Sequence, residues 1–333
     1  MNDDDLIALI APDIPDSQFD SLRRAVAVRT MARDDRRRRP DGTNSHREGP
    51  RRAMKVAVLG AGGLLGRHVV EEMARRGREV LALDHAACAI EDARAVASAL
   101  AGCALAVNCA AFTDVDGAES EPDRSFAINA LGAENVARAT AAAGAVVLHV
   151  STDFVFGGRL DRPQDEFDLP EPLSLYARSK RAGELLVERA NPRSHVVRVQ
   201  GLYGRGGRNF ASRLSSLLRE GKRLRLDGER RVQPTSARAA ARAIADIAAT
   251  DRWGTWHASC RGATTWAGFA TRLAARLDLS PTWEAVPSAA LALRAPRPPN
   301  CLLEHRRLAL CGLPPLPTWE EALEESLKER DLS

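Results

Sequence analysis

The clearest hydrophobic pattern in the chain begins at Met54. The run MKVAVLG (54–60) is apolar and rich in β-branched residues, as buried strands are, and it ends in glycine. Apolar residues then recur at helical spacing, at Leu64, Val69 and Met73. The pattern predicts a strand, a tight turn and a helix at the start of the folded part of the chain.

Apolar strands continue to alternate with helices up to about residue 200. Strands are predicted at REVLALD (78–84), LAVNCAA (105–111) and AVVLHVS (145–151), and an alanine-rich helix is predicted at 131–143. Strands of this kind, alternating with helices, form a parallel sheet that helices cover on both faces. The predicted fold class is therefore α/β, with a doubly wound (Rossmann) parallel sheet.

Beyond about residue 200 the pattern loosens into loops that contain glycine and proline. Helices are predicted there at 208–219, 236–249, 265–277 and from Thr318 onward. The stretch APRPPNCLLEH (295–305) has too many prolines for a helix interior. We divide the folded part into a Rossmann domain at 54–200 and, at 201–333, mainly a smaller α/β substrate-binding cap, some of whose elements return to the sheet.

Residues 1–53 differ in composition from the rest of the chain. From Arg33 to Arg52 the sequence is densely charged and poor in apolar residues, so it buries too little surface to offset the entropy of ordering. We predict a disordered N-terminal extension at 1–53. The four arginines at 36–39 belong either to a solvated linker, the simpler interpretation, or to a tail for an anionic partner.

Composition narrows the classes of function. The 333 residues are 44% apolar, enough for a sizeable core, and the net charge of +4 comes from arginines spread along the chain rather than from one basic face. The six cysteines are scattered with no C-x-x-C pair, which favours neither a zinc site nor a disulfide framework. No apolar run suits a signal peptide or a membrane span. We expect a cytoplasmic protein that binds no metal, no nucleic acid and no membrane.

The turn VLGAGGLLGRHV (58–69) has the glycine spacing of a dinucleotide-binding loop. The first glycine permits a tight turn, the second lets backbone amides approach a pyrophosphate, and the third allows close helix packing. An ordinary strand-to-helix turn is the alternative. However, the following strand ends in Asp84, about eighteen residues after Gly66, which is the separation usual for the acidic residue that binds the ribose. The cofactor-binding residues predicted here are Gly60, Gly63, Leu64, Leu65, Gly66 and Asp84.

The sequence does not decide whether the cofactor carries a 2′-phosphate. Asp84 can hold the ribose 2′-hydroxyl of NADH, whereas Arg67 can pair with the 2′-phosphate of NADPH. Arg67 is equally well explained as a surface residue of the helix. The predicted cofactor is therefore NADPH or NADH.

The stretch PLSLYARSKRAGE (172–184) holds the candidate proton donor. If it is helical, the spacing i, i+4 puts Tyr176 and Lys180 on one face, although an isolated pair of this kind is usually a surface pair. A phenol donates a proton to an alkoxide more readily when a nearby ammonium stabilises its anion. Ser151 or Thr152, at the end of the predicted strand 145–151, would add a hydroxyl. This combination favours a dehydrogenase.

Several longer motifs carry a resemblance to a known family. They are NCAAFTDVDGAESEPDRSFAINALGAENVA, HVSTDFVFGG, PLSLYARSKRAGE, VRVQGLYGRGGRNF, VQPTS and RPPNCLLEHRRLALCGLPPLPTWEEAL. Together they make the chain similar, from Met54 to about residue 328, to the extended short-chain dehydrogenase/reductase superfamily. Within it, the chain resembles the dTDP-4-dehydrorhamnose reductase family.

The resemblance implies an NAD(P)H-dependent reduction of the C4 keto group of a nucleotide-linked 4-keto-6-deoxyhexose, dTDP-4-dehydro-L-rhamnose in the first place. It implies a nucleotide-sugar substrate and is compatible with a homodimer. The catalytic set it implies is Thr152, Tyr176 and Lys180. The further cofactor residues it implies are Asn108, Ala110, Ala111, Tyr176 and Lys180, and the sugar-facing residues are Thr113, Val115, Asp153 and Phe154.

Two other functions remain open at this point. A non-catalytic NAD(P)-binding regulatory subunit of the same fold would not need the complete proton-transfer set that this chain keeps. A sugar-nucleotide epimerase or dehydratase would need an additional acid/base pair, and Phe154 offers none. Asn108, Thr113 and Asp153 also have plain structural interpretations as caps of strand ends, turns or helices, and Val115 as a core residue.

The chain departs from the family's pattern at three places. Phe154 keeps an aromatic ring but lacks a hydroxyl, and Gly201 stands where the family commonly has a tryptophan that packs on the sugar. The segment ARAAA lacks the usual acidic residue near Arg238. We expect the chain's five tryptophans to fill the core of the cap, with one of them as a candidate for the missing ring. His149 is interpreted as a core histidine rather than a proton shuttle.

Overall fold

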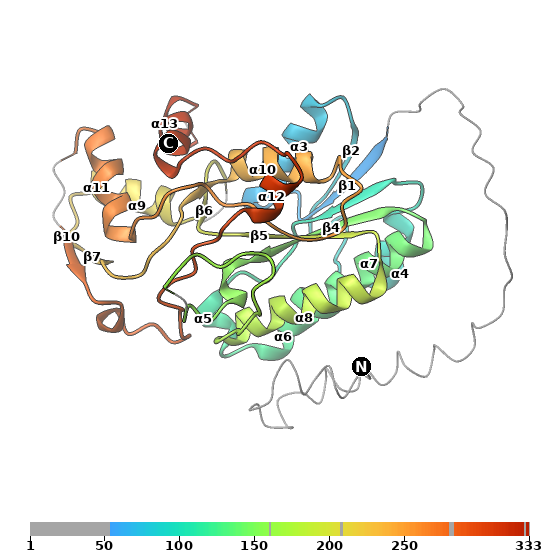
Figure 1. Ribbon diagram of the computed structural model, residues 1–333, viewed down its shortest axis with the longest axis horizontal. Coiled ribbons are helices and arrows are strands. Elements are labelled where there is room, and N and C mark those ends of the chain that lie inside the picture. Colours follow the sequence, from blue (N-terminus) through green and yellow to red (C-terminus); the bar gives the residue numbers. More distant parts are fainter. Residues whose placement is uncertain (1–53, 160, 207–208, 280–282, 330, 333) are drawn as a thin grey trace, which may run out of the picture.

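A six-stranded parallel sheet forms the centre of the computed structural model, which describes residues 54–159, 161–206, 209–279, 283–329 and 331–332 (Figure 1). The predicted extension at 1–53 lies outside the described residues. In order across the sheet the strands are β2 (Glu79–Leu83), β1 (Lys55–Leu59), β3 (Leu105–Asn108), β4 (Val146–Thr152), β5 (Ser194–Val199) and β9 (Gly254–His257).

The four predicted strands are confirmed, with one correction. The predicted strand 105–111 ends at Asn108, because the Asn108 side chain turns back to accept a hydrogen bond from the backbone N–H of Ala110. Two strands of the sheet, β5 and β9, were not predicted. A hydrophobicity pattern misses β5 because Ser194, His195 and Arg198 are polar. All three are nevertheless buried, and His195 and Arg198 bond to side chains inside the protein.

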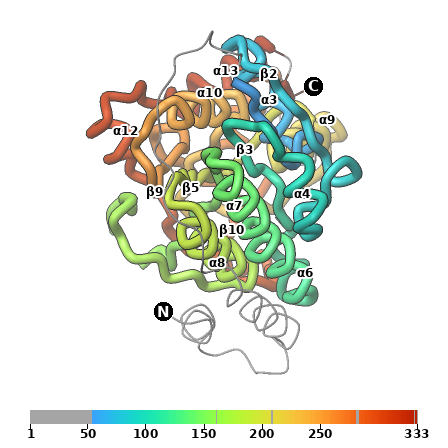
Figure 2. The backbone as a smooth tube through the Cα atoms, turned by 90° about the vertical axis from the view of Figure 1, so that its right-hand side faces the viewer, coloured from blue at the N-terminus to red at the C-terminus, as the bar shows by residue number. Residues whose placement is uncertain are grey.

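Helices cover both faces of the sheet, which confirms the Rossmann fold class (Figures 1 and 2). One face carries α3 (Leu64–Arg75) and α10 (Ala237–Ile247), and the other carries α4 (Ala93–Ala99), α7 (Ala133–Ala142) and α8 (Leu175–Ala190). The alanines of α10 let it pack closely against α3. Both α10 and β9 come from the chain after residue 200, so the sheet and its covering helices are completed by late segments.

The remaining elements lie beyond the carboxyl ends of the central strands (Figure 1). They include α9 (Phe210–Arg219), α11 (Trp266–Arg276) and α13 (Trp319–Lys328), the pair β7 (Leu224–Asp227) and β10 (Trp283–Val286), and the pair β6 (Leu202–Tyr203) and β8 (Thr235–Ser236). The predicted helices begin and end within two residues of these bounds. The segment 295–305 is not helical, as its prolines indicated.

Short helices complete the structure. These are α5 (Val115–Ala118), α6 (Pro122–Phe126), η3 (Ala127–Gly132), η4 (Asp153–Val155), η5 (Ser288–Leu291) and α12 (Arg306–Leu310). Of the tryptophans, Trp266 and Trp319 join an aromatic cluster around Phe269 in the cap, but Trp256 lies in β9 of the main sheet and is wrongly assigned to the cap by the sequence.

The strand order reverses between β1 and β3, which predicts a ligand-binding crevice at the carboxyl edge of the sheet. After β2 the chain crosses back over β1 to form β3, so the connections leaving β1 and β3 run to opposite faces. In open α/β sheets, ligands bind where the order reverses in this way, outside the carboxyl ends of the strands. The glycine turn that follows β1 and the loops that follow β3 and β4 all meet there.

Helix α8, which bears Tyr176 and Lys180, is seated by an unusually close backbone approach. Residues 127–132 form a π-helical turn in which the Asn129 side chain bonds the backbone of Phe112 and the hydroxyl of Ser179 on α8. A Cβ atom at Gly183 would lie only 2.1 Å from the carbonyl oxygen of Asn129. The helix therefore rests on this turn at a position where only glycine fits.

We predict that Gly183→Ala displaces α8 and lowers the free energy of unfolding by about 1–3 kcal/mol, because the added methyl group meets a fixed backbone carbonyl. Urea unfolding followed by circular dichroism measures the loss. An unchanged midpoint would show that the contact with Asn129 is not restrictive.

Candidate active site

The glycine turn after β1 is built for close approach. Gly60 has φ +72°, a conformation that favours glycine, and a Cβ there would lie 2.6 Å from the backbone nitrogen of Ala110. A Cβ at Gly66 would lie 2.2 Å from the carbonyl oxygen of Gly60. Gly63 caps the start of α3 without any side chain and is exposed. The turn thus presents a bare helix N-terminus, the arrangement that suits a pyrophosphate.

The side chains around this turn suit the rest of a dinucleotide. Leu65 is buried beneath the turn and Leu64 is half-buried beside it. Asp84, at the end of β2, is exposed and accepts a hydrogen bond from the N–H of Ala87. Arg67 is also exposed, and its Nε donates to the carbonyl of Gly62 in the turn itself. A carboxylate and a guanidinium therefore flank the turn together.

The residues after β3 form the neighbouring edge of the crevice. Asn108 is buried and stands beside His149 of β4 in the strand register. Its side chain acts as the strand-end cap that was the structural alternative, because its Oδ1 accepts from the N–H of Ala110 at 3.1 Å. Ala110 and Ala111 are half-buried and continue this edge next to Gly60.

Tyr176 and Thr152 meet at the end of β4. The two side chains are neighbours, and the Thr152 hydroxyl donates to Asp153 Oδ1 at 3.0 Å. The ring of Phe154 stands edge-on to that of Tyr176, with centroids 6.2 Å apart. Of the two hydroxyls weighed from the sequence, Thr152 is thus the one beside Tyr176.

The expected lowering of the Tyr176 pKa by Lys180 is wrong in this structure. Burial raises the pKa of Tyr176 to about 12, the neighbouring Thr152 side chain opposes this rise, and the charge of Asp153 adds to it. The Lys180 amine instead donates to the backbone carbonyl of Val150 at 2.7 Å. Burial lowers the pKa of Lys180 to about 8.

Asp153 is a buried carboxyl beside the Tyr176–Thr152 pair. Burial raises its pKa to about 6, partly opposed by hydrogen bonds from Gln200 and Thr152. Gln200 Nε2 donates to Asp153 Oδ2 at 2.7 Å and to the carbonyl of Cys301 at 2.9 Å. Gln200 therefore ties the end of β4 to the cap, a role that its sequence position did not indicate.

The predicted sugar-facing residues after β3 lie near the proline-rich segment of the cap. Thr113 is exposed and Val115 is half-buried at the start of α5, where the helix is capped by Asp114 rather than by Thr113. Asp116 of α5 forms a two-oxygen ion pair with Arg297, at 2.6 and 2.8 Å. The pair holds segment 295–305 over this end of the crevice.

Arg230 adds a positive charge that sequence analysis missed. Its side chain is 12% exposed and lies 3.6 Å from Asp227, while its Nε is buried without a partner among the described residues. Its charge acts on Asp153 and is itself opposed by that of Arg297. The charges of two guanidinium groups and of Asp153 thus act on one another in this region, an arrangement that an anionic ligand would stabilise.

Two of the three departures from the family's pattern, Gly201 and the missing acidic residue near Arg238, have structural counterparts. Gly201 has φ +54°, and a Cβ there would lie 3.2 Å from the outer ring of Trp266. Trp266 is half-buried and packs against Phe210 at 4.3 Å between centroids. A tryptophan ring thus lies against the glycine. Near Arg238, the carboxylate comes from the C-terminal segment, where Asp331 lies 3.3 Å away.

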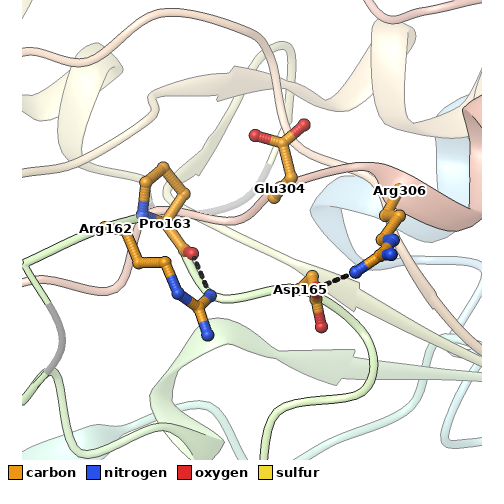
Figure 3. A pocket seen from close by; sticks show the side chains of 5 residues that line it. All are labelled: Arg162, Pro163, Asp165, Glu304 and Arg306. Atoms are coloured by element: carbon orange, nitrogen blue, oxygen red, sulfur yellow. Dashed lines mark hydrogen bonds and ion pairs between the residues drawn. The ribbon is translucent and has the colours of Figure 1, made fainter.

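A surface hollow of about 530 Å³ lies apart from these residues (Figure 3). It is lined by Arg162, Pro163, Asp165, Glu304 and Arg306. Its arginines are engaged: Arg162 pairs with Asp168, and Arg306 pairs with Asp165. None of its lining residues was predicted as a site residue, and the hollow offers no reacting group to the crevice.

The sequence also made predictions about cysteines, metal sites and membrane spans. All six cysteines are free thiols. Within the described ranges, no group of three or more His, Cys, Asp or Glu side chains is placed to hold a metal ion. Likewise, no helix in the described part of the chain is long and apolar enough to span a membrane.

Comparisons with known proteins agree with this geometry. Residues 54–332 match the family model described as the RmlD substrate binding domain. The chain is 39% identical over 279 residues to a dTDP-4-dehydrorhamnose reductase of Streptomyces griseus, covering 81% of this chain and 91% of that protein. It is 36% identical over 285 residues to a probable dTDP-4,6-dihydroxy-2-methyloxan-3-one 4-ketoreductase of Streptomyces antibioticus, covering 83% and 95%.

A solved structure gives the same result. The dTDP-4-dehydrorhamnose reductase of Bacillus anthracis in complex with NADP superimposes with a TM-score of 0.82 at 31% identity. The match covers 84% of this chain and all of that one.

We predict that Asp84→Asn raises the preference for NADPH over NADH by roughly tenfold, because it removes a carboxylate that repels a 2′-phosphate and binds a 2′-hydroxyl. Fluorescence titration with each reduced cofactor measures the two dissociation constants. An unchanged ratio would place the 2′ position away from Asp84.

Proposed function

Because the chain belongs to the family of the RmlD substrate binding domain, we propose that it is an NAD(P)H-dependent oxidoreductase that reduces the C4 keto group of a dTDP-4-keto-6-deoxyhexose, in the first place dTDP-4-dehydro-L-rhamnose to dTDP-L-rhamnose. The relatives named as reductases of that substrate, and the one solved with NADP, support this proposal. We place the reaction in the cytoplasm, where nucleotide sugars and reduced nicotinamides are made.

The observation that carries the proposal is the pairing of Tyr176 with Thr152 beside the glycine turn. When bound, the nicotinamide supplies the hydride for C4. The ketone oxygen then gains negative charge, which Thr152 can stabilise by a hydrogen bond and Tyr176 can neutralise by giving up its phenolic proton. A Cβ atom at Gly60 or Gly66 would collide with backbone atoms, so both positions must be glycine. The turn therefore keeps a bare backbone at the N-terminus of α3, where the pyrophosphate of a dinucleotide can bind.

The structure offers less to the two alternative functions. A purely regulatory subunit would have no use for a phenol and a threonine hydroxyl brought together at the end of β4. An epimerase or dehydratase needs a further acid/base pair at this place. Asp153 supplies one carboxyl, whose oxygens accept from Thr152 and Gln200, and the next side chain along the chain is the apolar ring of Phe154. Reduction is the chemistry that the side chains around Tyr176 support best.

The identity of the sugar is the finer part of the proposal. We infer that Trp266, lying against Gly201 from another element, provides the ring surface on that side of the cleft. A ring that arrives from α11 approaches a ligand from a different direction than one at residue 201. The ketoreductase relative of Streptomyces antibioticus, whose named substrate differs from dehydrorhamnose, makes a related dTDP-ketosugar the second candidate.

We infer that Arg230 and Arg297 face the diphosphate of the substrate. Two like charges held near one another are stabilised by an anion, and Asp227 and Asp116 only partly neutralise them. The buried, unpartnered Nε of Arg230 leaves a donor available in that direction. The nucleotide end of the substrate would then lie between β7 and segment 295–305, with the sugar toward Tyr176.

We predict that the purified chain oxidises NADPH or NADH when dTDP-4-dehydro-L-rhamnose is generated in place, and that Tyr176→Phe lowers kcat by about 10²- to 10⁴-fold. Loss of nicotinamide absorbance measures both. The matched control is Tyr203→Phe, which changes the chain's other tyrosine in the core of the cap and should leave the rate near that of the parent. Cofactor binding without oxidation of any activated ketosugar would favour the regulatory alternative.

We predict that Arg230→Met raises KM for the nucleotide sugar by roughly 10- to 100-fold, because a charge-assisted hydrogen bond to phosphate is lost, with a smaller effect on kcat. Steady-state kinetics at saturating cofactor separates the two constants. Arg225→Met, at an exposed position of β7, is the control. A fall in kcat at constant KM would move Arg230 away from the diphosphate.

A further inference from the structure

Three buried polar side chains form a line from the end of β3 to α8. Asn108, His149 and Lys180 are each no more than 2% exposed. The amide nitrogen of Asn108 lies 3.2 Å from Nδ1 of His149, and Nε2 of His149 lies 3.3 Å from Nζ of Lys180. Both ring nitrogens are therefore engaged, and the second one faces the Lys180 amine.

The backbone fixes the orientation of the Asn108 amide. Its Oδ1 accepts from the N–H of Ala110, so its NH₂ group is the one that faces the ring. An amide NH₂ only donates, and His149 Nδ1 must accept. Burial and the nearby charge of Lys180 hold the pKa of His149 well below its usual range, so the ring is neutral and carries a single proton. That proton is on Nε2, directed at Lys180.

An ammonium group has no lone pair with which to accept this proton. A neutral amine has one, and it can still donate to the carbonyl of Val150 as Nζ does here. We propose that His149 is a positioning residue whose Nε2–H, oriented by Asn108, donates to Lys180 and stabilises its neutral amine. The sequence indicated only a core histidine whose ring is hydrogen-bonded, whereas this proposal gives His149 an effect on Lys180.

The other groups around Nζ bear on the same equilibrium. Burial favours the neutral amine, whereas the charge of Glu184, one turn further along α8, favours the ammonium. The carboxylate of Glu184 is shared with Arg198 and Arg181. Burial raises the pKa of Cys109 to about 12, and that of Tyr176 likewise, so both stay uncharged near neutral pH.

The consequence for the reaction rests on the proposed function, whereas the position of the proton on His149 does not. After Tyr176 gives its proton to the ketone oxygen, the phenolate has to regain one. An amine whose pKa lies near the working pH can both release and take up a proton, which an ordinary lysine, protonated up to about pH 10, does poorly. His149 would tune Lys180 for that exchange.

The first test observes the ring directly, on the full chain at neutral pH. A long-range ¹H–¹⁵N spectrum of histidine-labelled protein, assigned with His149→Phe, distinguishes the two neutral ring forms. We expect the proton of His149 on Nε2. His257 is an internal reference, because its Nδ1 faces the carbonyl of Glu304 at 2.9 Å and must carry the proton there. A proton on Nδ1 of His149, or a doubly protonated ring, overturns the proposal whatever the activity of the chain.

The second test measures the lysine itself. The chain has only four lysines, so the ¹³Cε signal of Lys180 can be followed as pH is varied. Without the Nε2–H donor, His149→Phe should raise the titration midpoint of Lys180 by about one pH unit or more. If the ring acted only by excluding water, the more apolar phenylalanine would leave the midpoint unchanged or lower it, and that result overturns the proposal.

A second variant keeps the test valid if the phenylalanine disturbs packing. Asn108→Asp has nearly the same shape, but its carboxylate accepts from Ala110 N–H and from the ring, which moves the ring proton to Nδ1 and leaves Nε2 as an acceptor for the ammonium. We expect the Lys180 midpoint, near pH 8 in the parent chain, to rise. A midpoint that stays in place contradicts the role of Asn108.

Discussion

The burial of the Lys180 amine at the ends of the central strands is the constraint on which the site depends. An ammonium group in an apolar surrounding is costly, and proteins respond by pairing it, bonding it or removing its proton. Here the amine is bonded to the end of β4 and to His149, while the nearest carboxylate, Glu184, is held by arginines. The position of α8 is therefore fixed by a polar contact as well as by apolar packing.

That contact belongs to a larger buried polar layer under the crevice. Glu184 forms a two-oxygen ion pair with Arg198 of β5, at 2.9 and 2.8 Å, and the Arg198 guanidinium lies over the ring of Phe156, 4.9 Å from its centroid. Removing one partner of such a pair leaves an uncompensated buried charge, which is strongly destabilising. The layer joins α8, β4 and β5 into one unit, so Tyr176, Thr152 and Lys180 keep their relative positions.

Much of the fold was predictable because its signals are local. The glycine spacing after β1, the apolar strands β1 to β4 and the periodicity of α9, α10, α11 and α13 each occupy one short segment. Strand β5 escaped prediction because its polar residues are satisfied only by partners far away in the chain. The sequence predicted that some late elements return to the sheet but not that β9 and α10 are the ones, because nothing local distinguishes an element that rejoins a sheet from one that remains in a cap.

The sequence by itself determined which chemical groups are present and their local spacing: the three glycines of the turn, and a tyrosine and a lysine one helical turn apart. Only the tertiary structure decided what each group contacts. Thr152 rather than Ser151 meets Tyr176, Gln200 reaches Asp153 from 47 residues away, and Asn108 orients His149 from 41 residues away. The reason is physical: proton positions and pKa values are set by neighbours and by exclusion from water, and both arise when separate strands and helices are brought together.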